Sequence, residues 1–188
     1  TMTPWDPQEV WPLLIAALEK RPAVVVPFVT RPNETVIDRE ALGLAPPSAT
    51  TTGVYALRRA NGEGDGALVL QGSEVAYAFV ETALPMLEKD GVDLNVYYVS
   101  SAELFTKLSL EERENIYPES AAMNAMGITG FTLPTLYRWV RSDRGIGCSM
   151  YPFQKGHFLG SGPGEVVLKE AGLDGESQYK AIMDYLKK

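Results

Sequence analysis

After residue 53, short apolar runs alternate with segments that have the period of an α-helix, and this alternation most constrains the fold. The predicted strands are 54–58, 67–71, 94–100 and 146–150. The predicted helices are 74–90, 109–117, 134–141, 163–171 and 176–187, whereas 118–132 has no clear pattern. Because such alternation is typical of parallel sheets, we predict an α/β fold of three layers, with helices on both faces of a mostly parallel sheet.

The N-terminal part carries a single helix and a single strand. Asp6 and the proline after it suit a helix start, and the helix pattern ends at Lys20. The Val-rich run 23–29 predicts a buried strand, in which Pro27 favours an edge position because it lacks an N–H. One helix and one strand cannot enclose a core.

The stretch 30–53 is rich in proline and threonine and is long for a connection inside one domain. We therefore predict two units. Residues 1–53 form an incomplete unit with its linker, and residues 54–188 form a complete domain. This division indicates a piece of a longer chain.

Charge and hydropathy exclude several classes of protein. Lys and Arg number 17 and Asp and Glu 24, which gives a net charge of −7, and no basic cluster exceeds pairs such as Arg58-Arg59 and Lys187-Lys188. Such a surface repels phosphate backbones, so we expect no nucleic-acid partner. We also expect no membrane partner, since no apolar run approaches the ~20 residues of a membrane span. No secretory signal is recognisable, and a single cysteine agrees with the cytoplasmic location that we expect.

The counts of histidine and cysteine limit the chemistry of this chain. His157 and Cys148 are the only residues of their types, so one chain cannot form a closed His/Cys metal site. A Ser-His-Asp triad would have to use His157, but no nucleophile motif accompanies it. We expect His157 to be a loop residue with a structural hydrogen bond, and Cys148 to be a buried apolar residue in the strand 146–150.

Two glycine-containing motifs have a structural and a functional interpretation. Gly64-Asp65-Gly66 is similar to the start of a thiamine diphosphate motif, but it precedes a strand instead of ending one, so we predict a plain turn. Gly72-Ser73-Glu74 joins a strand to a helix, where free N–H groups could hold an anion. We favour the simpler alternative, in which Ser73 caps the helix and Glu74 offsets its dipole.

Four sequence blocks resemble the C-terminal domain of transketolase, in the order and spacing found there. They are 67–75, with its strand and Gly-Ser-Glu turn; 99–105, with Ser-Ala-Glu-Leu-Phe; 112–118, an acidic helix ending in Tyr-Pro; and the closing segments 145–147, 158–163 and 169–172. Pro32 and Leu159 depart from the family pattern, and 119–144 lacks a usual Val-Glu-Ala-Gly segment.

The N-terminal part resembles the end of the family's pyrimidine-binding domain, where a Val-rich strand leads to Ser-Arg-Gln-Asn. Thr30-Arg31-Pro32-Asn33 stands at that place. The resemblance implies that Arg31 binds the substrate phosphate, and a guanidinium after a strand suits this role. From its residue type alone, a solvated Arg31 is the alternative.

The resemblance also implies a function for the intact enzyme. It would be a transferase of the pentose phosphate pathway that moves a two-carbon ketol unit between sugar phosphates, using thiamine diphosphate and a divalent cation such as Mg²⁺. In that family this domain is structural: it supports the homodimer and has no catalytic centre, so we expect the chain alone to be inactive. Its partners would be the remainder of its own enzyme chain and the sugar phosphates.

Two alternatives remain. One is the same domain of another thiamine-dependent enzyme, such as deoxyxylulose-phosphate synthase or a 2-oxo acid dehydrogenase component. The other is a free-standing interaction or regulatory module.

Overall fold

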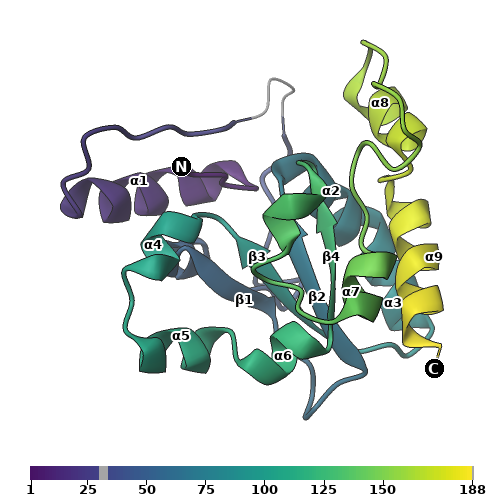
Figure 1. Cartoon of the computed structure of the whole chain (residues 1–188), viewed down its shortest axis with the longest axis horizontal. Helices are drawn as coiled ribbons and strands as arrows, with labels where there is room; N and C mark the ends of the chain where they lie inside the picture. The colour runs from purple at the N-terminus through teal and green to yellow at the C-terminus, as the bar shows by residue number, and fades with distance from the viewer. Residues whose placement is uncertain (30–33, 188) are drawn as a thin grey trace.

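A mixed sheet of four strands forms the centre of the computed structural model, which describes residues 1–29 and 34–187 (Figure 1). In sheet order the strands are β1 (Val54–Arg58), β3 (Leu94–Val99), β2 (Gly66–Gln71) and β4 (Ala125–Thr129). β2 pairs in parallel with β3 and β4, whereas β1 is antiparallel to β3. The predicted α/β fold with a mostly parallel sheet is therefore confirmed.

The nine α-helices of the described chain are short, apart from the first and the last. They are α1 (Val10–Glu19), α2 (Ser73–Ala78), α3 (Leu84–Lys89), α4 (Ala102–Thr106), α5 (Leu110–Ile116), α6 (Glu119–Met123), α7 (Asp143–Cys148), α8 (Gly164–Ala171) and α9 (Gly175–Leu186). Four further turns of helix are η1 (Pro7–Glu9), η2 (Pro47–Thr52), η3 (Phe79–Ala83) and η4 (Leu133–Leu136). No helix of the described residues has the length and apolar character that crossing a membrane would require.

Alternate side chains of the sheet point into two separate cores. Leu68 and Leu70 of β2 pack beneath α2, η3 and α9, while Ala67 and Val69 pack on the opposite face with side chains of α4 and α6. Each core contains buried aromatic rings, among them Phe79 on the first face and Trp139 on the second. This alternation explains why the central strands appear as continuous apolar runs in the sequence.

The predicted helix 74–90 is continuous but contains one π-turn. α2, η3 and α3 follow one another without a break, and η3 has π geometry, with the N–H of Leu84 bonded to the carbonyl of Phe79. Pro85 follows directly, in the first turn of α3, where its missing N–H costs least.

The predicted strand 146–150 is wrong, because these residues end a helix. The Ser142 hydroxyl accepts the N–H of Gly145 at 3.0 Å and caps α7. Met150 forms only an isolated bridge with Ile128. Cys148, expected in that strand, is the last residue of α7 and is only partly buried. The fourth strand is instead β4, within the stretch left unassigned, and the predicted helix 134–141 contains only the 3₁₀ turn η4.

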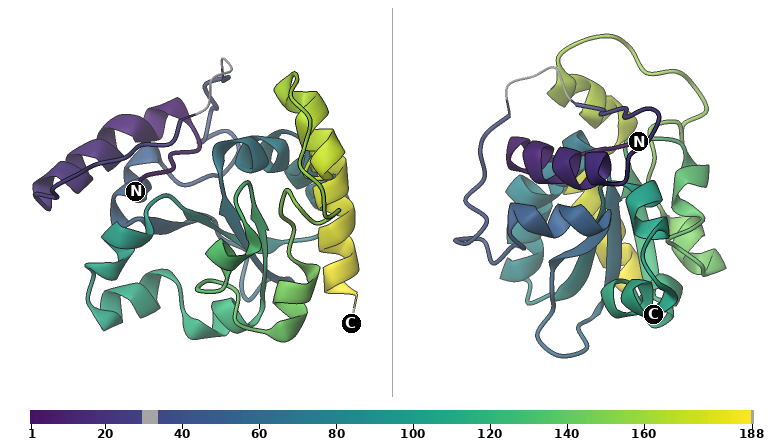
Figure 2. Two further views of the ribbon diagram at one scale, coloured as in Figure 1. Left: turned by 45° about the horizontal axis from the view of Figure 1, so that its top comes forward. Right: turned by 90° about the vertical axis from the view of Figure 1, so that its left-hand side faces the viewer.

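The predicted buried strand 23–29 is also wrong. These residues are extended, but within the described chain they pair only through a bridge between Met2 and Pro27. Val24 is 73% exposed and Phe28 52% exposed. The segment lies beside α1 at one end of the molecule (Figure 2), and the described residues form no second sheet that could cover it.

The helix predicted after Asp6 is confirmed as η1 followed by α1. Trp5, just before it, is buried in the main core, where its ring meets those of Tyr77 and Tyr98 at centroid distances of 5.3 and 6.4 Å. Leu13 of α1 packs with Leu104 of α4. The N-terminal residues are thus fastened to the sheet, although 23–29 is not part of it.

Candidate functional site

Arg31, which the resemblance implies as a phosphate ligand, lies outside the described residues. The nearest described parts of the chain lie at the carboxyl edge of the parallel strands. The ring of Phe28 packs edge-on against Phe131, just after β4, at 6.2 Å. The hydroxyl of Tyr77 on α2 donates to the carbonyl of Thr35 at 2.8 Å. In α/β sheets this edge is where ligands are usually bound.

The junction of β2 and α2 at this edge does not have the predicted cap. Ser73 is buried, and its hydroxyl donates to the carbonyl of Trp5 at 2.7 Å instead of accepting a helix N–H. Gly72 takes the N-cap position with φ of 113°, a conformation that favours glycine. The Ser73 prediction is wrong because a chain segment 68 residues away uses its hydroxyl.

Glu74 fills the space in front of that junction. Its carboxylate lies against Gly130, where an added Cβ would come within 1.9 Å of Oε1. Burial by the surrounding protein and the charge of Glu34 raise the pKa of Glu74. A carboxylate at this place disfavours the anion-site interpretation of Gly72-Ser73-Glu74 and agrees with an acidic side chain beside the helix start.

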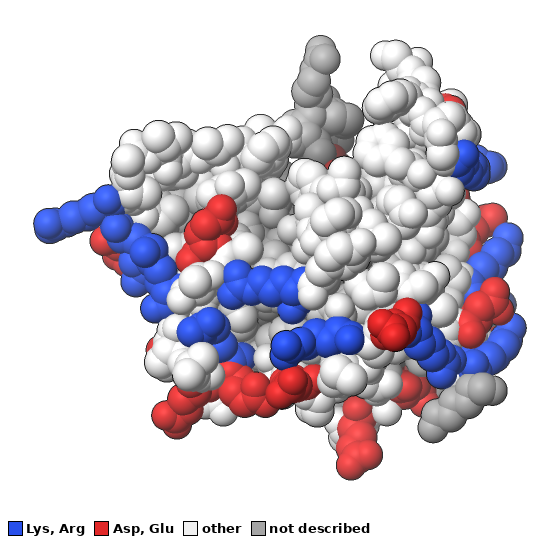
Figure 3. Space-filling view, viewed as in Figure 1, with Lys and Arg blue, Asp and Glu red and all other residues white. Residues whose placement is uncertain are grey.

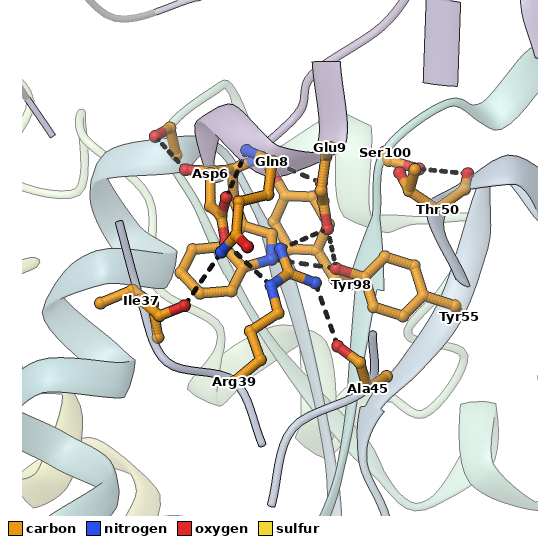
Figure 4. A network of polar contacts seen from close by, with 12 residues as sticks. Asp6, Gln8, Glu9, Ile37, Arg39, Ala45, Thr50, Tyr55, Tyr98 and Ser100 are labelled. Carbon is orange, nitrogen blue, oxygen red and sulfur yellow. Dashed lines mark hydrogen bonds and ion pairs between the residues drawn. The ribbon is translucent and has the colours of Figure 1, made fainter. Parts of the chain in front are cut away.

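A buried polar cluster lies beneath the N-terminal segment (Figure 4). We call Asp6, Glu9, Arg39 and Tyr55 the Arg39 cluster. The Arg39 guanidinium donates to Asp6 Oδ2 at 2.8 Å, to Glu9 Oε1 at 2.9 Å and to the carbonyl of Ala45 at 3.2 Å. Side-chain exposure is 4% for Arg39 and 0% for both carboxylates.

Further donors complete the cluster. The Tyr55 hydroxyl donates to Glu9 Oε1, the backbone N–H of Trp5 donates to Glu9 Oε2 at 3.2 Å, and the N–H of Gln8 donates to Asp6 Oδ1 at 2.6 Å. The guanidinium also lies 4.6 Å from the centre of the Trp5 ring. Three distant segments therefore meet here: η1, the loop that contains Arg39, and β1.

Burial dominates the electrostatics of the Arg39 cluster. It raises the pKa of Glu9, although Arg39 and the hydroxyl of Tyr55 act in the opposite direction. Burial and the charge of Glu9 raise the pKa of Tyr55 well above 10.0. Of the residues of the Arg39 cluster, only Asp6 is predicted from the sequence, as a helix cap. The cap is confirmed. Nothing in the sequence near Arg39 indicates that it is buried.

The other residues singled out in the sequence lie far from this cluster. Gly64 and Asp65 connect the turn at 62–63 to β2, which begins at Gly66, and Asp65 Oδ2 accepts the N–H of Asp93 at 2.8 Å. His157 lies in the predicted loop, with Nδ1 3.3 Å from the carbonyl of Lys155 and Nε2 3.8 Å from Glu170. Among the residues with described positions, no three His, Cys, Asp or Glu side chains are grouped to hold a metal ion.

An apolar surface extends over the outer side of α1 and the adjacent extended segment. Trp11 is 70% exposed, and further exposed apolar side chains belong to the same two elements. We call this set the α1 surface: Trp11, Ile15, Leu18, Val24, Val26 and Phe28. Charged side chains are sparse on the part of this face that lies over α1 and 23–29 (Figure 3). A group of large exposed apolar side chains on neighbouring elements is typical of an interaction surface.

Comparison with known proteins gives one consistent result. No family model matches the chain. It is 27% identical over 185 residues to transketolase of Aquifex aeolicus, which covers 96% of this chain and 25% of that protein. It is 26% identical over 169 residues to transketolase of Halalkalibacterium halodurans, which covers 86% of this chain and 22% of that protein.

Solved structures agree in fold. Transketolase from Leishmania mexicana superimposes with a TM-score of 0.71 and 20% identity, over 99% of this chain and 25% of that one. Transketolase from Pichia stipitis, solved with sedoheptulose 7-phosphate, gives 0.73 and 19%, over 98% of this chain and 25% of that one. The resemblance to the transketolase C-terminal domain is thus confirmed, and the chain spans about a quarter of the length of the curated relatives it matches.

Proposed function

We propose that this chain is the C-terminal part of a thiamine diphosphate-dependent transketolase that transfers a two-carbon ketol unit between sugar phosphates. The observation that carries the proposal is the extent of the match: almost the whole chain aligns with about a quarter of a transketolase, in both sequence and fold. We further propose that this enzyme acts in the pentose phosphate pathway and is cytoplasmic, as the resemblance implies.

The described residues do not fit thiamine diphosphate or its cation. The motif that could have begun a cofactor site, Gly64-Asp65-Gly66, leads from a turn into the start of β2, and its carboxylate accepts the backbone N–H of Asp93. No described group of carboxylates or histidines is arranged for a divalent cation. We therefore assign the cofactor, the cation and the catalytic centre to the other part of the enzyme, and a structural role to this one.

Within this proposal, the α1 surface binds the remainder of the enzyme. It consists of one helix face and an extended segment with β-branched residues, a combination that α/β domains normally cover with further sheet. We further propose that residues 1–53 belong to the neighbouring pyrimidine-binding unit, that 54–188 is the C-terminal domain, and that the assembled enzyme is a homodimer.

The proposed role of Arg31 is to bind the phosphate of the sugar substrate. Support comes from the described residues on either side of it in the chain, since Phe28 and Thr35 both contact the carboxyl edge of the sheet. A guanidinium binds a phosphate through two parallel N–H donors, which suits recognition of the end of the substrate remote from the reacting carbon.

A chimera tests the function. The C-terminal quarter of the Aquifex aeolicus transketolase is replaced by this chain, and ketol transfer is assayed with a ketose phosphate donor and an aldose phosphate acceptor. We expect the chimera to be active and the 188-residue chain to be inactive and to bind no thiamine diphosphate in calorimetry with Mg²⁺. Turnover by the chain alone, or a folded chimera without transfer activity, would contradict the proposal.

Variants of the chimera test the α1 surface. Trp11→Ser with Ile15→Ser should prevent assembly and abolish transfer, because both side chains would be buried against the rest of the enzyme. Leu110→Ser, at an equally exposed position on α5, is the matched control and should leave activity unchanged. Equal activity of both variants would show that the α1 surface is not the contact.

A further inference from the structure

The Arg39 cluster contains more negative than positive charge. Its two carboxylates, Asp6 and Glu9, share one guanidinium, so the fully ionised cluster has a net charge of −1 in a site that solvent does not reach. An uncompensated buried charge is costly, and a carboxyl group relieves it by taking up a proton.

The described residues around the Arg39 cluster supply no second cation. The ionisable groups that face Glu9 from the elements packed against it are Arg39 from the loop after 34, Tyr55 from β1 and Tyr98 from β3, with Asp6 from its own segment. Beyond these, Tyr77 of α2 faces Asp6, and Glu74 faces Tyr98. Within this group, drawn from the described residues, Arg39 is the single positive charge.

Hydrogen bonding and the charge balance have opposite effects on the ionisation of Glu9. All three partners of the Glu9 carboxylate are donors: Arg39, the Tyr55 hydroxyl and the backbone N–H of Trp5. These bonds favour the ionised carboxylate, whereas burial and the excess negative charge favour the protonated one. Asp6 accepts two backbone or side-chain donors from Gln8 besides Arg39, so its charge is better satisfied locally.

We propose that Glu9 makes the attachment of the N-terminal segment to the rest of the domain depend on pH. In mild acid the Glu9 carboxylate takes up a proton from the solvent while the chain remains folded. The new O–H bond forms at the Glu9 carboxyl, and the cluster becomes electrically neutral. The folded form, in which η1 is held against Arg39 and β1, then binds this proton more tightly than the detached form, so acid strengthens the attachment and neutral pH weakens it.

The sign follows from the raised pKa of Glu9, for which burial is the main cause. A carboxyl group with a pKa above its ordinary value of 4.5 in the folded chain gives its full contribution to stability below 4.5. That contribution is lost as the pH rises through the folded pKa. Between the two values the unfolding constant of the wild type should rise by up to about tenfold per pH unit for this one proton.

Nuclear magnetic resonance of protein labelled with ¹³C at the glutamate carboxyl groups tests the proposal directly. Glu9, assigned in the wild type by correlating its carboxyl carbon with its backbone amide, should titrate with a midpoint above 4.5 in the folded chain. The indole N–H of Trp5, which donates to Tyr55 at 2.9 Å, should shift with the same midpoint. A Glu9 midpoint at or below 4.5 would overturn the proposal, and it is measured on the wild type, so it does not depend on the folding of any variant.

Urea unfolding between pH 5 and 8 tests the linkage. The ratio of the wild-type unfolding constant to that of Glu9→Gln should increase with pH and then level off. Glu63→Gln, in the exposed turn before β2, is the control and should stay parallel to the wild type. A pH-independent ratio for Glu9→Gln would refute the linkage. The proposed function does not depend on this result.

Discussion

Replacing Arg39 by methionine removes the only cation of the Arg39 cluster and keeps an unbranched side chain beside the Trp5 ring, 4.6 Å from the present guanidinium. Two buried carboxylates then face each other without an opposite charge. Breaking a buried ion pair by removing one partner costs about 3–5 kcal/mol. A domain has only about 5–15 kcal/mol of stability in total, so we expect Arg39→Met to be folded but weakly stable at pH 7.

Two features of the structure separate this loss from a simple loss of packing. First, acid protonates the unpaired carboxylates, so the loss should become smaller at pH 5 than at pH 7. Second, Glu9→Gln in the Arg39→Met background removes one of the stranded charges. The double variant should therefore be more stable than the sum of the single changes by about 1–3 kcal/mol, within the usual range of coupling for groups in contact.

Urea unfolding followed by circular dichroism measures these free energies. Arg59→Met is the matched control, because Arg59 lies 5.6 Å from the Tyr97 ring but forms no ion pair among the described residues, so its loss should stay below about 1 kcal/mol. An Arg39→Met loss as small as that of the control would refute the reasoning. So would a loss that is the same at both pH values and unaffected by Glu9→Gln.

Three further predictions concern the proposed enzyme and the fold. In the intact enzyme, Arg31→Ala should lower kcat/KM for a sugar phosphate by roughly 10- to 150-fold, as expected for a hydrogen bond to a charged group, and much less for the dephosphorylated analogue; equal losses would mean a structural role. Limited proteolysis should cut first within 30–53, and a first cut within 67–100 would contradict the division at residue 53. In urea unfolding, Gly145→Ala should lower the free energy of unfolding by about 1–3 kcal/mol, because its Cβ would lie 2.0 Å from the carbonyl oxygen of Ala125. The control Gly147→Ala has open space at its Cβ and should be neutral or slightly stabilising.

The central strands could be predicted because both of their faces are buried. Leu68 and Val69 point into different cores, so β2 has no polar position to interrupt its apolar run. The helix predicted over 109–117 is present as α5. It could be predicted because Ser109 and Glu112 form a capping box, in which each side chain bonds the other's backbone and no remote residue is needed. Local hydrogen bonding and burial on both faces each produce a pattern that can be recognised in the sequence.

The errors arise where distant residues decide the local structure. Ile146 and Cys148 look like strand residues, but they end a helix that packs closely on β4, where Gly145 lies against the carbonyl of Ala125. Ser73 has the position of a cap, yet Trp5 takes its hydrogen bond. The hydrogen bonds of Arg39 and Tyr55 to the two carboxylates of the Arg39 cluster join residues 30 to 46 positions apart, so no short sequence window contains the cluster.

The segment 23–29 shows a different kind of mismatch, which bears on function. Its run of valines has the composition of a buried strand, yet Val24 and Val26 are 73% and 43% exposed. The same mismatch occurs on α1, where Trp11 and Ile15 are apolar residues suited to burial but face outward. Both elements are otherwise anchored, through Met2 and Leu13, so loose packing does not explain the disagreement. The α1 surface therefore has a composition suited to burial and is held in place, but nothing in the described chain covers it. This supports the proposal that the remainder of a transketolase covers the α1 surface.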